Sequence, residues 1–181
     1  MRIISGTHGG RRIQPPASMP HTRPTTDIAK EGLFNVLQNN IEFESIKLLD
    51  LFGGTGCISY EMMSRGVMDA TIVEKDHTMF EYIKKTAAQL AFTQLKLVNN
   101  DVFRYIEMCN EQFDFIFAGP PYALGTIDDL PIQIFEKKIL HPKGWFVLEH
   151  TPRNDYKKFA HYKTERNYGT TIFSIFIMPA L

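Results

Sequence analysis

Short apolar runs alternate with amphipathic stretches over most of the chain, and this alternation limits the possible folds severely. The runs that we expect to form strands are Lys47–Phe52, Ala70–Val73, Leu95–Val98, Phe113–Ala118, Trp145–Glu149 and Thr171–Met178. The amphipathic stretches between them predict helices over Cys57–Arg65, His77–Phe92, Phe103–Met108 and Asp128–Leu140. Strands and helices in alternation predict a doubly wound α/β core built on a mostly parallel sheet.

The first forty residues do not follow this alternation. Arg2–Ser5 and Arg11–Gln14 are short extended segments separated by glycines, which predicts a β-hairpin. Prolines at positions 15, 16 and 20 then require an extended connector. Thr26 or Asp27 can cap the helix that we expect over about residues 28–38.

Charge is distributed unevenly along the chain, although its 181 residues include 20 basic and 20 acidic side chains. Residues 1–26 hold four arginines and no acid, residues 27–136 hold 8 basic and 17 acidic side chains, and residues 137–181 hold 8 basic and 3 acidic. This asymmetry suggests that both ends of the chain face a polyanion. We therefore expect a basic hairpin and connector over residues 1–26 and a larger domain over residues 27–181.

Several classes of protein are disfavoured by what the sequence lacks. No apolar run approaches the 18 residues of a membrane span, and the N-terminus has no continuous apolar segment of the secretory kind. Cys57 and Cys109 are the only cysteines, and neither they nor the six histidines have the spacing of metal ligands. We expect a cytoplasmic globular protein with no metal and no membrane partner.

The first expected strand ends in a glycine-rich loop of the kind that holds nucleotides. Gly54 and Gly56 let a ligand approach the backbone, but the loop lacks a complete G-x-G-x-x-G and the lysine of a P-loop. Asp50, at the mouth of this strand, would repel a pyrophosphate and attract an ammonium or a sulfonium. Glu74 follows Gly54 by 20 residues, where an acceptor for both ribose hydroxyls belongs. Together these features favour S-adenosylmethionine over NAD, although each acid can also be a strand-end cap.

Four segments resemble, in order, the motifs of class I (Rossmann-like) methyltransferases that modify exocyclic amino groups: L-D-L-F-G-G-T-G, V-E-K-D, N-D-V-F and G-P-P-Y. The N-terminal segments R-I-I-S-G-T-H-G-G-R-R-I and R-P-T-T-D-I-A-K-E-G-L-F-N-V-L are more specific. With the closing Y-G-T-T-I-F-S-I-F, they make the whole chain resemble the RsmD family of bacterial small-subunit (16S) ribosomal RNA guanine-N2 methyltransferases. The resemblance implies a seven-stranded sheet, S-adenosylmethionine as methyl donor, and ribosomal RNA of the small subunit or its assembly intermediate as partner.

The resemblance also implies roles for individual positions. Cofactor contacts are expected at Asp50, Phe52, Gly54, Gly56, Glu74, Asp101 and Val102. Gly53 stands at a position of the family's first cofactor motif where alanine is commoner. Among these, Glu74 matches the acid that binds ribose, and Asp101 the acid beside adenine. Asp101 can also cap the helix that begins near Phe103. The catalytic motif matches Gly119, Pro120, Pro121 and Tyr122, although its first position is usually Asp or Asn.

Glycine at position 119 removes a side chain that the chemistry uses. The lone pair of a guanine amino group is delocalised into the ring, and two acceptors on its N–H groups localise it toward the methyl carbon. The carbonyl of Pro120 is one acceptor, and Tyr122 would stack on the base. Losing the other acceptor typically costs about 2.7–4 kcal/mol, or roughly 10²–10³ in rate. We expect normal cofactor binding and slow transfer, unless water, Asp114 or Asp128 replaces the missing group.

Arginines near the N-terminus are the candidate RNA contacts, namely Arg2, Arg11, Arg12 and Arg23. Other functions stay open beside the RNA reading. The same chemistry on adenine N6 of DNA or on a protein glutamine is the nearest alternative. A protein that binds cofactor and RNA but catalyses weakly is another, because of Gly119. An NAD-dependent oxidoreductase is less favoured, because Asp50 stands where pyrophosphate would pass.

Overall fold

The computed structural model describes residues 1–19 and 24–181. Its elements are, in chain order, η1 (Gly6–His8), α1 (Asp27–Leu37), η2 (Phe43–Ser45), β1 (Lys47–Leu51), α2 (Cys57–Ser64), β2 (Asp69–Glu74), α3 (His77–Gln89), β3 (Leu95–Asn99), α4 (Val102–Met108), β4 (Phe113–Ala118), α5 (Asp129–Glu136), β5 (Leu140–His150), β6 (Tyr162–Tyr168) and β7 (Thr171–Ile177). The predicted alternation of strands and helices is confirmed. The helix expected to reach Leu140 ends instead at Glu136, and β5 begins where that helix was expected to end.

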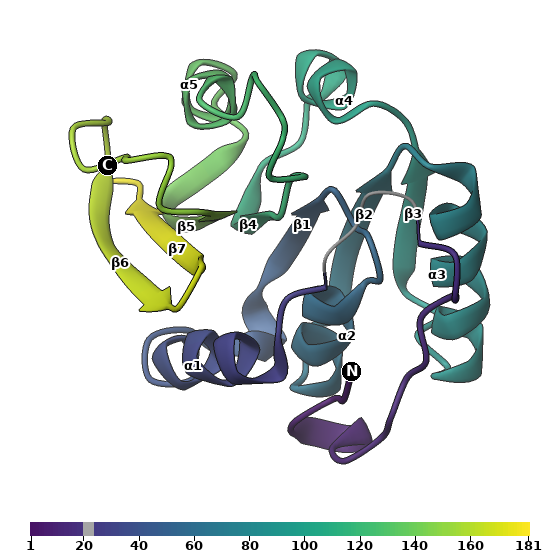
Figure 1. The fold of residues 1–181 in the computed structure, drawn as a ribbon. Coiled ribbons are helices and arrows are strands. Elements are labelled where there is room, and N and C mark those ends of the chain that lie inside the picture. The colour runs from purple at the N-terminus through teal and green to yellow at the C-terminus, as the bar shows by residue number, and fades with distance from the viewer. Residues whose placement is uncertain (20–23) are drawn as a thin grey trace.

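The strands of the described residues form one seven-stranded sheet in the order β3-β2-β1-β4-β5-β7-β6. β7 is antiparallel to both of its neighbours, β5 and β6, and the pairs from β3 to β5 are parallel (Figure 1). The chain leaves β1 toward β2 and β3 and later returns to β4 on the other side of β1. At such a reversal the connecting loops diverge, and a crevice opens beyond the carboxyl ends of the strands.

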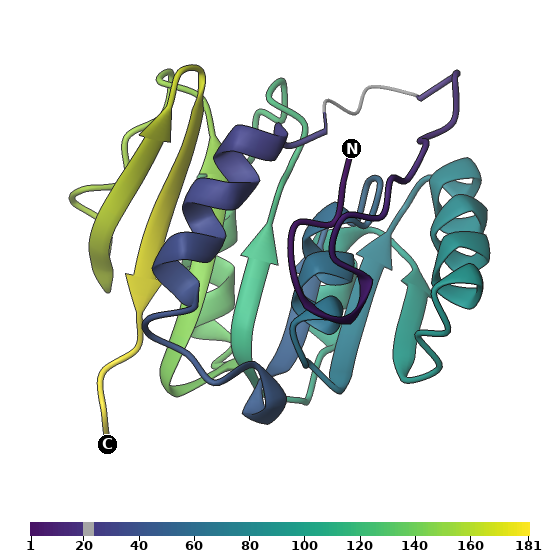
Figure 2. The same cartoon turned by 90° about the horizontal axis from the view of Figure 1, so that it is seen from below.

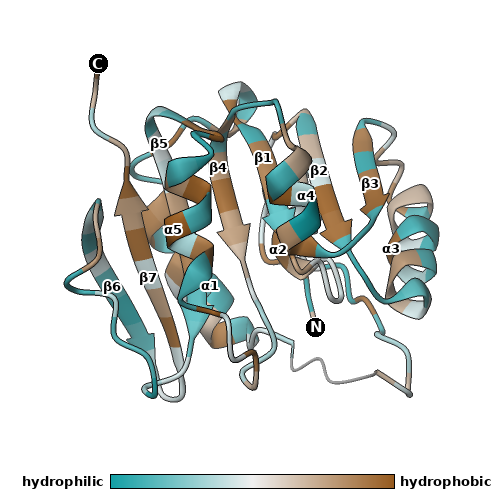
Figure 3. Ribbon diagram, turned by 90° about the horizontal axis from the view of Figure 1, so that it is seen from above, coloured by the Kyte–Doolittle hydropathy of each residue, from teal (hydrophilic) through white to brown (hydrophobic). Residues whose placement is uncertain are grey.

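Helices cover both faces of the sheet. α4 and α5 lie on one face, whereas α1, α2, α3 and the N-terminal segment lie on the other (Figures 1 and 2). Because both faces are covered, central strands are apolar on both sides, and every residue of β4 except Asp114 is buried. β6, at the edge, is mostly polar, and the hydropathy colouring in Figure 3 shows its contrast with β7.

The N-terminal segment pairs with itself but does not form the β-hairpin that we expected. A single antiparallel bridge joins Arg2 and Arg12, and Ile3 exchanges backbone hydrogen bonds with Arg11 and Gly10 at 2.9 and 2.8 Å. The 3-10 turn η1 fills the space between the two arms. At Gly6 (φ +80°) a Cβ would lie 1.8 Å from the carbonyl oxygen of Ser64, so the turn is pressed against the end of α2. Close packing on the core thus takes the place of a regular strand pair.

A buried carboxylate fixes this segment to the core. Both oxygens of Glu61, on α2, accept backbone N–H groups, from Ile4 at 2.7 Å and from Ser5 at 3.0 Å. Arg65 donates its Nε to the same carboxylate at 2.8 Å, and the Nζ of Lys30 lies 3.5 Å away while donating to the carbonyl of Arg2. The described part of the basic extension is therefore attached to α1 and α2. Pro20 and Arg23 lie outside the described residues.

Within the described ranges, no helix has both the length and the apolar character needed to cross a membrane.

Candidate active site

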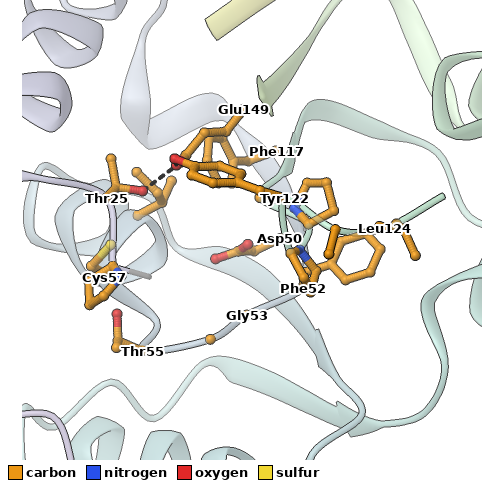
Figure 4. A pocket seen from close by; sticks show the side chains of 17 residues that line it. Thr25, Asp50, Phe52, Gly53, Thr55, Cys57, Phe117, Tyr122, Leu124 and Glu149 are labelled. Atoms are coloured by element: carbon orange, nitrogen blue, oxygen red, sulfur yellow. Dashed lines mark hydrogen bonds between the residues drawn. The ribbon is translucent and has the colours of Figure 1, made fainter. Parts of the chain in front are cut away.

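A cleft of about 560 Å³ opens at the carboxyl ends of β1, β4 and β5, where the strand order reverses. Seven residues that the sequence analysis proposed line it together: Asp50, Phe52, Gly54, Gly119, Pro120, Pro121 and Tyr122. Of the other described residues proposed as cofactor contacts, Gly56, Glu74, Asp101 and Val102 are not in the wall of the cleft. Figure 4 shows Asp50 pointing into the cleft between the loop after β1 and the aromatic ring of Tyr122.

The loop that connects β1 to α2 forms one wall of the cleft. Its backbone is left-handed at Phe52 (φ 64°), Gly54 (φ 55°) and Gly56 (φ 77°), and Gly56 donates its N–H to the carbonyl of Gly53 at 2.7 Å. A Cβ at Gly56 would lie 2.5 Å from the ring of Tyr60. The left-handed backbone and the tight packing on α2 both require glycine at position 56.

Asp50 is buried at the base of the cleft. Ser59 donates its hydroxyl to Oδ2 of Asp50 at 2.6 Å. The pKa of Asp50 is raised to about 7, mainly by burial and to a lesser extent by the nearby carboxylates of Glu74 and Glu149, while the hydrogen bond from Ser59 opposes the rise. A positively charged ligand here would favour the ionised form of this carboxyl.

Glu74 lies at the end of β2 and holds the glycine loop. Its Oε2 accepts the N–H of Gly54 at 2.7 Å, and its Oε1 accepts the N–H of Asp76 at 2.7 Å. Burial raises its pKa in spite of these two bonds. A carboxylate accepts about four hydrogen bonds, so this group keeps capacity for the hydroxyls of a ligand.

Asp101 caps α4, as its alternative interpretation predicted. Its Oδ1 accepts the N–H groups of Phe103 and Arg104 at 3.0 and 3.3 Å, and Lys75 lies 3.5 Å from Oδ2. Val102, the first residue of the helix, is buried in the apolar core between the sheet and α4 and α5. The side chain of Asp101 is 36% exposed to solvent.

Glu149, at the end of β5, is the acid in the cleft to which the sequence analysis gave no role. Only 4% of it is exposed, and it accepts hydroxyl groups from Thr25 at 2.6 Å and from Tyr122 at 3.1 Å. Burial raises the pKa of Glu149, and these two donors reduce the effect. The sequence could have indicated this position for Glu149. The expected strand ended at this residue, and the carboxyl ends of parallel strands meet at one edge of the sheet.

Gly119 lies directly beside this carboxylate. A Cβ at position 119 would be 3.8 Å from Oε2 of Glu149 and 3.0 Å from Cε1 of Phe117. Asp114 instead accepts the backbone N–H of Lys47 at 2.8 Å, at the amino end of the strands. Asp128 accepts the hydroxyl of Tyr156 at 2.8 Å. Of the described residues, neither Asp114 nor Asp128 lines the cleft, so neither replaces a side chain at position 119.

Arg11 and Arg12 line a second groove, of about 710 Å³, between the N-terminal segment and α3, which also contains Lys85. Arg2 is exposed nearby, and its backbone N–H donates to Asp27 at 3.4 Å. Arg23 falls in the part of the chain that the structure does not describe. Among residues 1–19 and 24–181, no group of three or more acidic, histidine or cysteine side chains is placed to hold a metal ion.

Comparisons by sequence identify the family of this chain, and comparisons of structure show which solved proteins share its fold. A family model described as "Conserved hypothetical protein 95" matches residues 1–177. The chain is 30% identical over 149 residues to Ribosomal RNA small subunit methyltransferase D of Escherichia coli (strain K12), covering 82% of this chain and 71% of that protein. The structure is similar to "Putative methyltransferase yhhF" of Escherichia coli, with a TM-score of 0.87, 24% identity and coverage of 100% and 99%. It also matches an RNA methyltransferase from Salinibacter ruber solved with S-adenosyl-L-homocysteine, with a TM-score of 0.66, 17% identity and coverage of 87% and 94%.

Proposed function

The chain belongs to the Conserved hypothetical protein 95 (RsmD) family of methyltransferases, and we propose that it methylates the exocyclic N2 of a guanine in small-subunit (16S) ribosomal RNA. The methyl donor is S-adenosylmethionine, and the substrate is the small ribosomal subunit or its assembly intermediate in the cytoplasm. One observation supports this most directly. The cleft combines a glycine loop, buried acids and a Pro-Pro-Tyr segment at the edge where β1 meets β4.

The residues around the cleft fit S-adenosylmethionine, which when bound supplies an electrophilic methyl carbon on a cationic sulfur. Asp50 is a buried carboxyl with a raised pKa, so a cationic ligand beside it offsets part of its desolvation. We assign the loop Phe52–Gly56 to the backbone of the cofactor and the remaining acceptor capacity of Glu74 to its ribose. Asp101 and Val102 are assigned to the adenine side.

The Pro120-Pro121-Tyr122 segment is assigned to the target base. Consecutive prolines restrict the backbone, so the carbonyl of Pro120 is directed before the base arrives. The ring of Tyr122 lies at the rim of the cleft, with its hydroxyl on Glu149 (Figure 4). An aromatic ring in this place suits stacking on a base taken out of its helix.

Residues 1–26 are proposed as the part that contacts RNA, and residues 27–181 as the methyltransferase domain. Arg11, Arg12 and Lys85 give the second groove a positive charge, and Arg2 is exposed beside it. Positive side chains of this kind neutralise phosphates and position a nucleic acid without reading its sequence. Arg23 is assigned to the same surface from its place in the sequence.

Labelled S-adenosylmethionine and small ribosomal subunits from cells that lack the enzyme test the proposal. We expect label in N2-methylguanosine at one site, and none with the Asp50→Ala variant. Gly125→Ala is the matched control, because a Cβ there meets nothing within 4 Å. Label in adenine of DNA or in a protein glutamine would contradict the proposed substrate, and tight RNA binding without any labelled product would contradict catalysis.

Binding of the cofactor can be tested separately from turnover. A cation beside Asp50 lowers the raised pKa of this carboxyl, so binding near pH 7 should release protons. Calorimetry in buffers of different ionisation enthalpy measures this release. We expect the Asp50→Asn variant to bind more weakly and to release fewer protons. Identical proton release from both proteins would contradict a role for Asp50 beside the cationic part of the ligand.

A further inference from the structure

We propose that Glu149 is a catalytic residue, and that its carboxylate accepts an N–H of the substrate amine in the place that a side chain at position 119 would take. This inference rests on the proposed function and names the acceptor that the sequence left unidentified. It follows from the position of the carboxylate, from the groups that hold it and from the room that Gly119 leaves.

The register of the sheet places Glu149 beside Gly119. Ala118 of β4 pairs with Leu148 of β5, so the next residues on each strand lie side by side at the mouth of the cleft. Both residues line the cleft, together with Pro120. A carboxylate from β5 therefore reaches the site that an acidic side chain from position 119 would otherwise fill.

The two positions are complementary in space. A Cβ at position 119 would be 3.8 Å from Oε2 of Glu149, so a carboxylate added there would stand against the one already present. It would also press on Phe117, whose Cε1 lies 3.0 Å from the same point. Glycine at 119 thus avoids a pair of like charges in a buried site and leaves Glu149 access to the cleft.

Hydroxyl groups hold the carboxylate in one orientation. Thr25, just before α1, donates to Oε2, and Tyr122, just after the two prolines, donates to Oε1. Each oxygen has one such donor and keeps a lone pair for another. An acceptor fixed in this way before the substrate arrives does not have to reorganise during the reaction.

The reaction favours a negatively charged hydrogen-bond acceptor next to the amine nitrogen. As the amine lone pair forms the N–C bond, the C–S bond breaks with its electrons on sulfur, and the nitrogen becomes positively charged. Glu149 stabilises this charge through the N–H bond that it accepts. It then takes one N–H proton from the nitrogen and passes it to water, which leaves the neutral methylated amine and restores the carboxylate.

Four variants test the role of Glu149 on subunits that the parent protein labels. Glu149→Ala should lower kcat by about 10²–10³, as for the loss of one preorganised group, and Glu149→Gln by about 10-fold or more. Gly119→Asn alone should not raise kcat. Adding Gly119→Asn to Glu149→Ala should restore activity by about 10-fold, because the amide then supplies an acceptor in the vacated space.

Folding and cofactor binding are checked in the same proteins. Affinity for S-adenosylhomocysteine, which is neutral at sulfur, should stay within about threefold of the parent in each variant. If Glu149→Ala lacks a cooperative unfolding transition, the kcat of the nearly isosteric Glu149→Gln is compared with that of the parent instead. The proposal fails if the folded Glu149 variant used in this comparison has a kcat within threefold of the parent. It also fails if Gly119→Asn alone increases kcat 10-fold.

A binding measurement without turnover gives a second test. With S-adenosylhomocysteine present, the parent should bind RNA with guanine at the mapped target position at least about fivefold more tightly than RNA with inosine, which lacks the amino group. Glu149→Ala should lose this preference. Absence of the preference in the parent, or its survival in the variant, overturns the role of Glu149. Absence of any labelled product from the parent instead refutes the proposed function itself.

Discussion

Buried acids are the main feature of this protein at the scale of single residues. Asp50, Glu74 and Glu149 come from the ends of three strands, and each is held by hydroxyl or backbone N–H donors. Burial raises the pKa of all three. Charged carboxylates in such a place destabilise the ligand-free protein, so the acids are better explained by ligand binding than by folding.

Asp50→Asn should stabilise the ligand-free protein more strongly at pH 8 than at pH 5. The pKa of Asp50 rises from 3.8 to about 7 on folding, so folding takes up a proton between these values and the free energy of unfolding falls as the pH rises. Above pH 7 the full cost is present, on the order of 2–4 kcal/mol. Glu74 and Glu149 act in the same direction in both proteins.

Urea denaturation at the two pH values measures this difference. Glu81→Gln, on the exposed face of α3, is the control for removal of one negative charge. Equal stability of parent and Asp50→Asn at pH 8 would show that burial does not penalise this carboxyl.

Gly53→Ala should destabilise the fold by about 1–3 kcal/mol through overpacking. A Cβ at position 53 would lie 2.3 Å from Cγ2 of Ile72 and 3.2 Å from Cδ1 of Ile83. Gly125→Ala, in open space, should change stability by less than about 0.5 kcal/mol. Thermal denaturation of the two variants distinguishes these outcomes, and equal melting temperatures would contradict the overpacking.

At the scale of elements, the N-terminal segment depends on α2 for its position. Ile3 and Ile13 pack in one apolar cluster with Tyr60, Ile72 and Ile83. The carboxylate of Glu61 completes the attachment by accepting two consecutive backbone N–H groups. Basic side chains of this segment are therefore presented from a fixed surface.

Glu61→Ala should release this attachment. The change leaves Lys30 buried without its acidic partner and removes the acceptor of two N–H groups, at a cost of about 3–5 kcal/mol. Hydrogen exchange at the amides of Ile4 and Ser5 should become faster by more than the global loss of stability explains. Glu81→Ala is the matched control, and unchanged protection at Ile4 and Ser5 in Glu61→Ala would contradict the attachment.

Sequence patterns predicted the central elements well and the peripheral ones poorly, for physical reasons. Strands such as β4 are buried on both faces and therefore appear as continuous apolar runs. β6 was not predicted, because Y-K-T-E-R-N-Y lies at the edge and shows no apolar run. The hairpin was predicted from the glycines of this segment, but Gly6 is pressed against the end of α2, a contact that no local pattern reveals.

At the scale of the whole molecule, the fold collects chemistry from distant parts of the chain. Thr25 and Glu149 are 124 positions apart and share a 2.6 Å hydrogen bond. The sequence analysis identified the R-P-T-T-D segment around Thr25 and expected a strand ending at Glu149, but it treated the two separately. Strand order was the missing information, because it brings β5 next to β4 and Glu149 next to Gly119.

The N-terminal segment and α3 together form the basic groove. The salt dependence of RNA binding tests whether this groove contacts RNA. Replacing Arg11 and Arg12 with Ala should weaken RNA binding and reduce the slope of log K against log salt by about 1.4, since each phosphate contact to a single strand contributes about 0.7. Lys137→Ala with Lys138→Ala removes the same charge beside the end of α5, on the opposite face. That control should leave the slope unchanged. An unaltered slope in the arginine variant would contradict the assignment of the basic groove to RNA.

The position of β7 has a consequence for the order in which the sheet is completed during synthesis. β7 follows β6 in the chain but lies between β5 and β6 in the sheet. During synthesis, β6 therefore emerges before β7, the strand that pairs with it. Because β6 is mostly polar, it can remain unpaired in water until β7 has been made. β5 gains its second neighbour only when β7 has emerged. The strand that carries Glu149 thus stays at the edge of the sheet until Thr171–Ile177 have been synthesised.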